Sequence, residues 1–244
     1  MDLLLPALCF FLGAFTQGLT GFGSAMIPVA LLPLVWPVPQ AVGVVTVFCV
    51  VLNAWFAWSL RADADRREVG GMAVAGALAT PLGLLFLRSY PSSTLLGALG
   101  AVLVVSSVLG LARPRLEPRA LHRGWGLLAG GAAGALSGAF NTAGPPMLVY
   151  ASLRGWGPAA FRANLQTFFL VTSCAACVGF VQAGIVNADT LRWNLLLAPA
   201  FAIGGLAGHW LHARLAARTF QRLVQGALLL VGLRYVAQGL GLGS

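Results

Sequence analysis

The sequence predicts an all-α polytopic membrane protein with two inverted repeats, each a re-entrant broken-helix hairpin plus three transmembrane helices. Three observations lead to this prediction. Of the 244 residues 59% are hydrophobic and only 9% are charged, whereas about a quarter of an average soluble domain is charged. Several apolar runs have the length of a membrane span, and two longer runs are interrupted by small polar residues. A water-soluble globule is excluded because there are too few polar side chains to cover its surface.

Five runs have the length of an ordinary span, since roughly 20 residues rising 1.5 Å each cross about 30 Å of hydrocarbon. A sixth span is expected at Thr219–Gln238, where Arg222 and Arg234 lie near the ends and can extend to the head groups. The amino terminus has Asp2 where a signal peptide carries positive charge, so we expect it to be retained. The five ordinary spans are Val38–Leu60, Val69–Leu87, Thr94–Ala112, Ala163–Val186 and Trp193–Trp210.

Two further apolar runs are each too long for one span and are broken in the middle. Leu3–Trp36 is broken around residues 16–24, and Trp125–Leu153 is broken around residues 137–146. A shift of 121 positions gives nine identities over the 36 positions from 13 to 48. We therefore predict a duplicated chain, with a first transmembrane repeat at 1–112, a basic cytoplasmic linker at 113–123 and a second transmembrane repeat at 124–244.

The loop arginines distinguish a hairpin from a crossing, because loop cations gather on the cytoplasmic side of a membrane. If both broken runs cross the membrane, the arginines divide nine to six between the two sides; if both are re-entrant, they divide twelve to three. The stronger bias favours two hairpins. One hairpin and three crossings per repeat give the two repeats opposite orientations and place both termini outside the cytoplasm.

The polar breaks are the predicted substrate site. Non-helical backbone within a membrane must be buried in protein or line a cavity. The second arm of each hairpin starts at its break, and a helix start offers unpaired N–H groups and partial positive charge to an anion. We expect the two tips to meet near the middle of the membrane. The predicted substrate-binding residues are Thr16, Gln17, Thr20, Gly21, Gly23, Ser24, Ser137, Asn141, Thr142, Gly144, Pro145, Arg162 and Gln166.

Each of these residues also has a purely structural interpretation. Glycine, serine and threonine allow close helix packing in membranes, and Arg162 equally fits a positive anchor at the cytoplasmic surface. The duplication of the polar break favours a ligand site over packing alone.

Charge and composition limit the other classes of function. The net charge of +9 comes from arginines in short gaps between apolar runs, which does not form a nucleic-acid face. The acidic residues fall in loops or at span ends, which argues against a cation pump. We predict no catalytic residue, metal or cofactor. The expected partners are a small anionic substrate and the lipid bilayer; a coupling ion, proton or sodium, and the oligomeric state are left open.

Three segments resemble the TauE/SafE family of sulfite and sulfonate exporters: GAFTQGLTGFGSAMIPVALLPL, GALSGAFNTAGPPMLVYASLRGWGPAAFRANLQTFFL and FAIGGLAGHWLHARL. The resemblance covers nearly the whole chain. It implies a bacterial inner-membrane permease for sulfite, sulfoacetate or other organosulfonates. The chain departs from the family in its first repeat, where Gly-Phe-Gly-Ser-Ala-Met-Ile-Pro replaces a richer glycine run before the proline.

We expect a secondary transporter that works by alternating access between the inverted halves. A passive anion channel is an alternative, because pores and carriers bind ions with the same groups. A membrane thiol-redox carrier is a second alternative, since Cys174 and Cys177 have the spacing of a redox pair; no basic neighbour is present to lower the pKa of either thiol. A structural membrane scaffold is the third.

Overall fold

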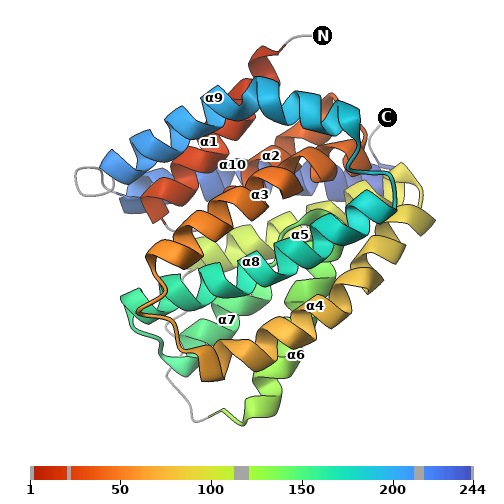
Figure 1. Cartoon of the computed structure of the whole chain (residues 1–244). Coiled ribbons are helices and arrows are strands. Elements are labelled where there is room, and N and C mark those ends of the chain that lie inside the picture. Colours follow the sequence, from red (N-terminus) through yellow and green to blue (C-terminus); the bar gives the residue numbers. More distant parts are fainter. Residues whose placement is uncertain (1–2, 21–22, 113–120, 212–216, 243–244) are drawn as a thin grey trace. The chain divides into compact units, whose positions relative to one another are not determined.

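The computed structural model describes residues 3–20, 23–112, 121–211 and 217–242, without the side chains of 20, 123 and 217–219 (Figure 1). These residues form helices and no strand, which confirms the all-α class. The elements are α1 (Leu4–Thr20), α2 (Met26–Leu31), the 3₁₀ turn η1 (Leu32–Leu34), α3 (Val38–Ser59), α4 (Arg66–Ser89), α5 (Ser92–Ala112), α6 (Arg123–Phe140), α7 (Gly144–Arg154), α8 (Pro158–Gln182), α9 (Ala188–Leu211) and α10 (Ala217–Gly239).

Five helices within the described residues are long and apolar enough to cross a membrane, namely α3, α4, α5, α8 and α9. They coincide with the five ordinary spans predicted from the sequence. The sixth predicted span is helical as α10, but it is not among the helices that meet these limits of length and apolarity. Large apolar side chains such as Leu78, Leu195 and Trp210 are exposed by three quarters or more, as expected of surfaces that face lipid.

Both overlong runs are interrupted where the sequence places the polar breaks. The first divides into α1 and the short α2, and the second divides into α6 and α7. At 1.5 Å per residue α6 rises about 27 Å and α7 about 16 Å, and α2 is shorter still. Neither second arm is long enough to cross about 30 Å of hydrocarbon alone.

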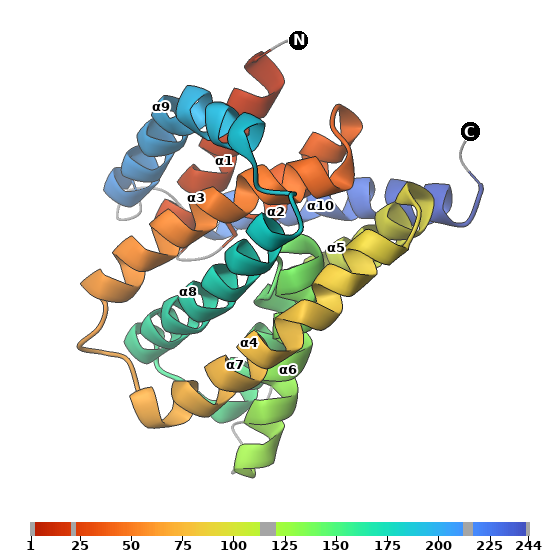
Figure 2. The same cartoon turned by 45° about the vertical axis from the view of Figure 1, so that its right-hand side comes forward.

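The chain forms two compact units, and each draws on both halves of the sequence. Unit 1 comprises residues 1–45, 90–113 and 187–244; unit 2 comprises residues 46–89 and 114–186. In unit 1, α1 packs along α9 and α5 packs along α10. In unit 2, α6 packs along α4, and α4 also packs against α8. The first helix of each broken run therefore lies beside a long helix from the other half of the chain (Figures 1 and 2).

Glycines let the backbones of these helix pairs approach closely. In unit 2 a Cβ on Gly134 of α6 would lie 2.0 Å from the carbonyl oxygen of Gly76 on α4. In unit 1 a Cβ on Gly208 of α9 would lie 2.2 Å from the carbonyl oxygen of Phe15 on α1. No side chain fits at such distances, so these positions require glycine, in the manner of small-residue interfaces between membrane helices.

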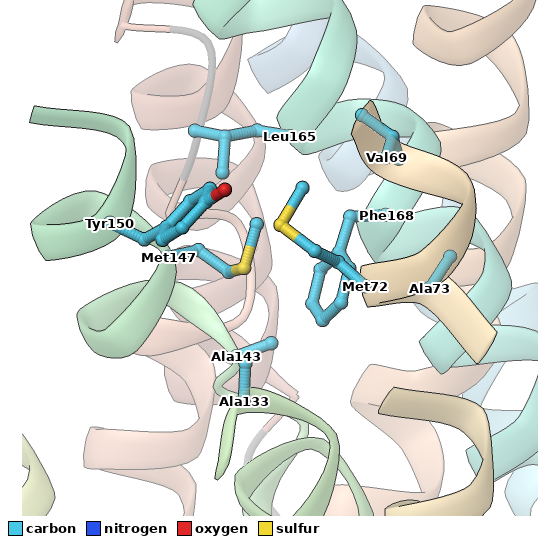
Figure 3. Close-up of a cluster of buried hydrophobic side chains, with 9 residues drawn as sticks. All are labelled: Val69, Met72, Ala73, Ala133, Ala143, Met147, Tyr150, Leu165 and Phe168. Carbon is cyan, nitrogen blue, oxygen red and sulfur yellow. The ribbon is translucent and has the colours of Figure 1, made fainter. Parts of the chain in front are cut away.

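A hydrophobic cluster in unit 2 holds the second broken run in place. Figure 3 shows Met147 of α7 beside Met72 of α4, with Phe168 of α8 on one side and Tyr150 on the other. Ala143, directly before α7, belongs to the same cluster. Burial of these side chains fixes α7 against α4 and α8, so the break between α6 and α7 is held by packed apolar contacts.

Candidate anion-binding site

The break between α6 and α7 is a tight turn closed by backbone hydrogen bonds. Asn141 follows the last residue of α6 with φ 51° and ψ 32°, the left-handed conformation that asparagine tolerates better than most residues. Its N–H donates to the carbonyl oxygen of Ser137 at 2.8 Å, and the N–H of Thr142 donates to Leu136 at 3.4 Å. This pattern is a common way to end a helix and reverse the chain.

Two side chains at this turn are buried, and each has a hydrogen-bonding atom without a partner in the described part of the chain. Asn141 is 7% exposed and Thr142 is 3% exposed, yet Asn141 Nδ2 and Thr142 Oγ1 have no hydrogen-bond partner among the described residues. The Ser137 hydroxyl makes a long contact of 3.5 Å with Asn141 Oδ1, which leaves the amide nitrogen as the unused end. A buried unsatisfied donor costs about 1–3 kcal/mol, so two adjacent ones indicate a site for an acceptor.

The start of α7 adds a positive electrostatic potential to the same turn. Helix α7 begins at Gly144, and Ala143 before it provides no side-chain cap. Pro145 and Pro146 have no N–H, so Ala143 and Gly144 are the residues that can supply N–H groups at this helix start. A Cβ on Gly144 would meet nothing within 4 Å. The turn thus combines neutral donors, a helix dipole and open space beside the backbone.

The first break is arranged differently, because its side chains satisfy local backbone groups. Gln17 Oε1 accepts the N–H of Ser24 at 3.1 Å, and the Thr16 hydroxyl donates to the carbonyl oxygen of Leu12 at 2.7 Å. Gly23 has φ +105°, a conformation that requires glycine. The predicted site residues Thr20, for its side chain, and Gly21 lie outside the described residues.

A small cavity adjoins this first break within unit 1. It is lined by Thr16, Gly23, Met26 and residues of α10 that include Gln221 and Gln225. Gln225 is buried, and its Oε1 has no hydrogen-bond partner among the described residues. The two glutamines were not predicted as site residues. The available signal was a pair of amides four positions apart in the sixth predicted span, which places both on one face of the helix.

The remaining two predicted residues lie on α8. Gln166 is 1% exposed, and Arg162 has a buried Nε without a hydrogen-bond partner in the described part of the chain. Other polar residues of unit 2 have structural roles. Asn164 Oδ1 accepts the N–H of Asp65 at 2.8 Å, and Asn53 Nδ2 donates to Ser173 Oγ at 3.1 Å.

The cysteines are free thiols. Cys9 and Cys49 are buried, Cys174 is exposed and Cys177 is partly buried on α8. A helix places residues three apart on one face, so Cys174 and Cys177 share a face of α8.

Comparison with known proteins supports a transporter. The model of the family described as "Sulfite exporter TauE/SafE" matches residues 5–235 of the chain. A relative from Cupriavidus necator, named "Probable sulfite/organosulfonate exporter TauE", is 29% identical over 228 residues, which cover 90% of this chain and 88% of the relative. No solved structure matches the chain.

Proposed function

Because the chain belongs to the sulfite exporter TauE/SafE family, we propose that it is a secondary transporter exporting small oxyanions such as sulfite, sulfoacetate or other organosulfonates. The proposed location is the bacterial inner membrane, with both termini outside the cytoplasm. The observation that carries the proposal is the pair of buried donor atoms Asn141 Nδ2 and Thr142 Oγ1, which have no hydrogen-bond partner among the described residues and lie next to the start of α7. An oxyanion has the acceptor oxygens that these donors lack.

Neutral donors suit a transport site. Transport needs binding that is favourable yet readily reversed. Amide, hydroxyl and backbone N–H groups at the Asn141–Gly144 turn give directional hydrogen bonds without a full positive charge. The open space beside Gly144 lets an oxygen atom approach the backbone.

The proposed architecture is a pair of inverted repeats with re-entrant hairpins, working by alternating access. The reciprocal helix pairing supports the duplication, since α1 packs on α9 and α6 packs on α4. The same shift of 121 positions relates Gly83 to Gly204 (204 − 83 = 121), and both glycines make a close backbone approach, to Ala135 of α6 and to Phe11 of α1 respectively. That the two hairpin tips meet at the middle of the membrane stays a prediction from the sequence.

Filling the space beside Gly144 tests the site. Gly144→Leu is expected to lower sulfite and sulfoacetate efflux from proteoliposomes at least about tenfold, the equivalent of one lost good hydrogen bond. The folded yield should not change, because the Cβ of the new side chain meets nothing within 4 Å. Gly70→Leu is the matched control, since Gly70 of α4 is exposed and its Cβ also meets nothing within 4 Å. Equal efflux from the two variants would exclude the turn as the site. Gly23 is unsuitable for this test, because its positive φ strains any substitution.

Two experiments separate the alternatives. A carrier shows saturable flux and exchange of internal for external substrate, whereas a passive anion channel conducts in proportion to the gradient. The Cys174→Ser/Cys177→Ser double variant is expected to transport like the unmodified protein. A loss of all function in that variant would instead support the thiol carrier.

A further inference from the structure

Unit 2 contains a polar cavity whose lining does not include the turn before α7. Its volume is about 470 Å³, within the range of about 300–1,000 Å³ that is typical of small-molecule sites. Residues from the first turns of α4 and α6 and from the last turns of α7 line it. The lining residues that carry charge or a hydroxyl are Asp65, Arg67, Glu68, Tyr150 and Arg154.

In the wall of this cavity the Glu68 carboxylate accepts hydrogen bonds from three donor groups. Both Nε and Nη2 of Arg154 donate to Glu68, Nη2 at 3.0 Å from Oε2, and the Tyr150 hydroxyl donates to Oε1 at 3.2 Å. Two parallel hydrogen bonds from one guanidinium are the geometry by which arginine binds planar oxyanions. The hydrogen bonds to Glu68 raise the pKa of Arg154, so its guanidinium stays charged.

A fourth donor lies beside this cluster but makes no hydrogen bond of normal geometry to it. The Trp156 ring packs edge-on against the Tyr150 ring, with centroids 5.8 Å apart. Its indole Nε1 is buried and makes no hydrogen bond of normal geometry in the described part of the chain, although it lies within reach of Glu68. A sulfonate or sulfite has a third oxygen, which a carboxylate lacks, and this oxygen can serve as an acceptor for the Trp156 N–H.

We propose that Arg154, Tyr150 and Trp156 form a second oxyanion site, in which the Glu68 carboxylate occupies the position that a sulfonate or sulfite takes when it binds. The incoming anion replaces Glu68 and accepts hydrogen bonds from the same guanidinium and phenol. The Trp156 N–H is placed to bind its third oxygen. Arg154 remains paired in both states, so the exchange does not leave its guanidinium without a partner, which is the costly outcome when one member of an ion pair is removed.

The position of Glu68 makes this exchange sterically simple. Glu68 lies in the first turn of α4 and its side chain is 17% exposed; that of Arg154 is 29% exposed. The cavity beside the pair offers room for both the anion and the displaced carboxylate. The lining charges are balanced, with Arg67 and Arg154 against Asp65 and Glu68, so the site binds an anion only as Glu68 moves away.

The exchange would also release one end of α7. Arg154 is the last residue of α7, and Gly144, next to the turn with the unpartnered donors, is its first. The ion pair ties this helix to the start of α4. The arginine distribution predicts that these ends lie on the cytoplasmic side, which would make the second site the place where an exporter first binds its substrate.

The test is sulfoacetate binding to the purified full chain by calorimetry, in a Thr142→Val background that weakens the first site. Glu68→Gln removes the competing carboxylate and preserves its shape, so affinity is expected to rise at least about tenfold. Adding Arg154→Gln to Glu68→Gln should abolish that gain. If Glu68→Gln leaves the affinity unchanged, or if the gain survives Arg154→Gln, the ion pair only joins the two helices and the proposal is wrong.

A second variant keeps the test decisive if Glu68→Gln does not fold. Trp156→Phe leaves the ion pair intact and removes the donor that hydrogen-bonds only to the incoming anion, so sulfoacetate affinity in the same background is expected to fall about five- to tenfold. An unchanged affinity would overturn the second site. Because the Thr142→Val background already weakens the turn before α7, neither result depends on whether that turn binds the transported anion.

Discussion

Gly134→Ala is expected to prevent unit 2 from folding, although it adds a single methyl group. The added Cβ would lie 2.0 Å from the carbonyl oxygen of Gly76 and 2.5 Å from Gly76 C and Cα. These are backbone atoms of α4, which cannot rotate away as a side chain can. Overpacking in a core costs about 1–3 kcal/mol when neighbours can adjust; here the two helices must separate, so the loss should exceed that range.

The same helix offers a matched control. Gly131→Ala adds the same methyl group to α6 at a position where it meets nothing within 4 Å. Alanine has a higher helix propensity than glycine by about 1 kcal/mol, so Gly131→Ala should raise the melting temperature of the detergent-solubilised protein. Fluorescence-detected size exclusion and thermal unfolding measure both variants. If Gly134→Ala were as stable as Gly131→Ala, α4 and α6 could not pack with their backbones in contact.

Unit 1 provides an independent repetition of this experiment. On α9, a Cβ at Gly208 would lie 2.2 Å from the carbonyl oxygen of Phe15, whereas a Cβ at Gly205 would make only an ordinary contact of 3.9 Å with Ala14. Gly208→Ala should therefore be destabilising, and Gly205→Ala should be tolerated. The result tests the pairing of α1 with α9 in the same way.

Thr142→Val is expected to lower transport strongly while leaving the protein as stable as before or more so. The hydroxyl is buried and makes no hydrogen bond in the described part of the chain, so its removal loses no internal contact and relieves a desolvated polar group. If that hydroxyl donates to the transported anion, its loss should reduce efflux of sulfite or sulfoacetate by about 10- to 100-fold. This reduction corresponds to the free energy that a hydrogen bond to a charged group contributes.

Thr172→Val is the control for this prediction. Thr172 is also fully buried, but its hydroxyl donates to the carbonyl oxygens of Phe168 and Phe169 on its own helix. Its replacement should leave efflux nearly unchanged. A Thr142→Val protein that is stable and transports at the normal rate would mean that the unpartnered hydroxyl is an inactive feature of the turn.

The spans and the breaks could be predicted because they depend on local composition. Apolar length alone located α3, α4, α5, α8 and α9 to within about five residues at each end, and interruption by small polar residues located the gap between α6 and α7. Asn141 and Thr142 could be selected because polar residues at a break within hydrocarbon must have a function or a partner.

The remaining features depend on which helices pack together, and local sequence does not determine this. Tyr150 lies 82 positions and Arg154 lies 86 positions after Glu68 in the sequence. The three residues meet only because α7 packs beside the start of α4. The role of Gln17 depends on a turn in which its side chain accepts the N–H of Ser24. Prediction from residue type placed Gln17 among the substrate ligands, but it could not show this local hydrogen bond.

The most direct test of the anion site at the start of α7 is a structure determined with bound selenite, the heavier congener of sulfite, whose selenium scatters anomalously. The proposal predicts an anomalous peak at the start of α7, with selenite oxygens within hydrogen-bonding distance of Asn141 Nδ2 and Thr142 Oγ1. That peak should be absent in the Thr142→Val variant. Selenite bound elsewhere, with Asn141 and Thr142 enclosed by protein atoms and out of contact with it, would contradict the account.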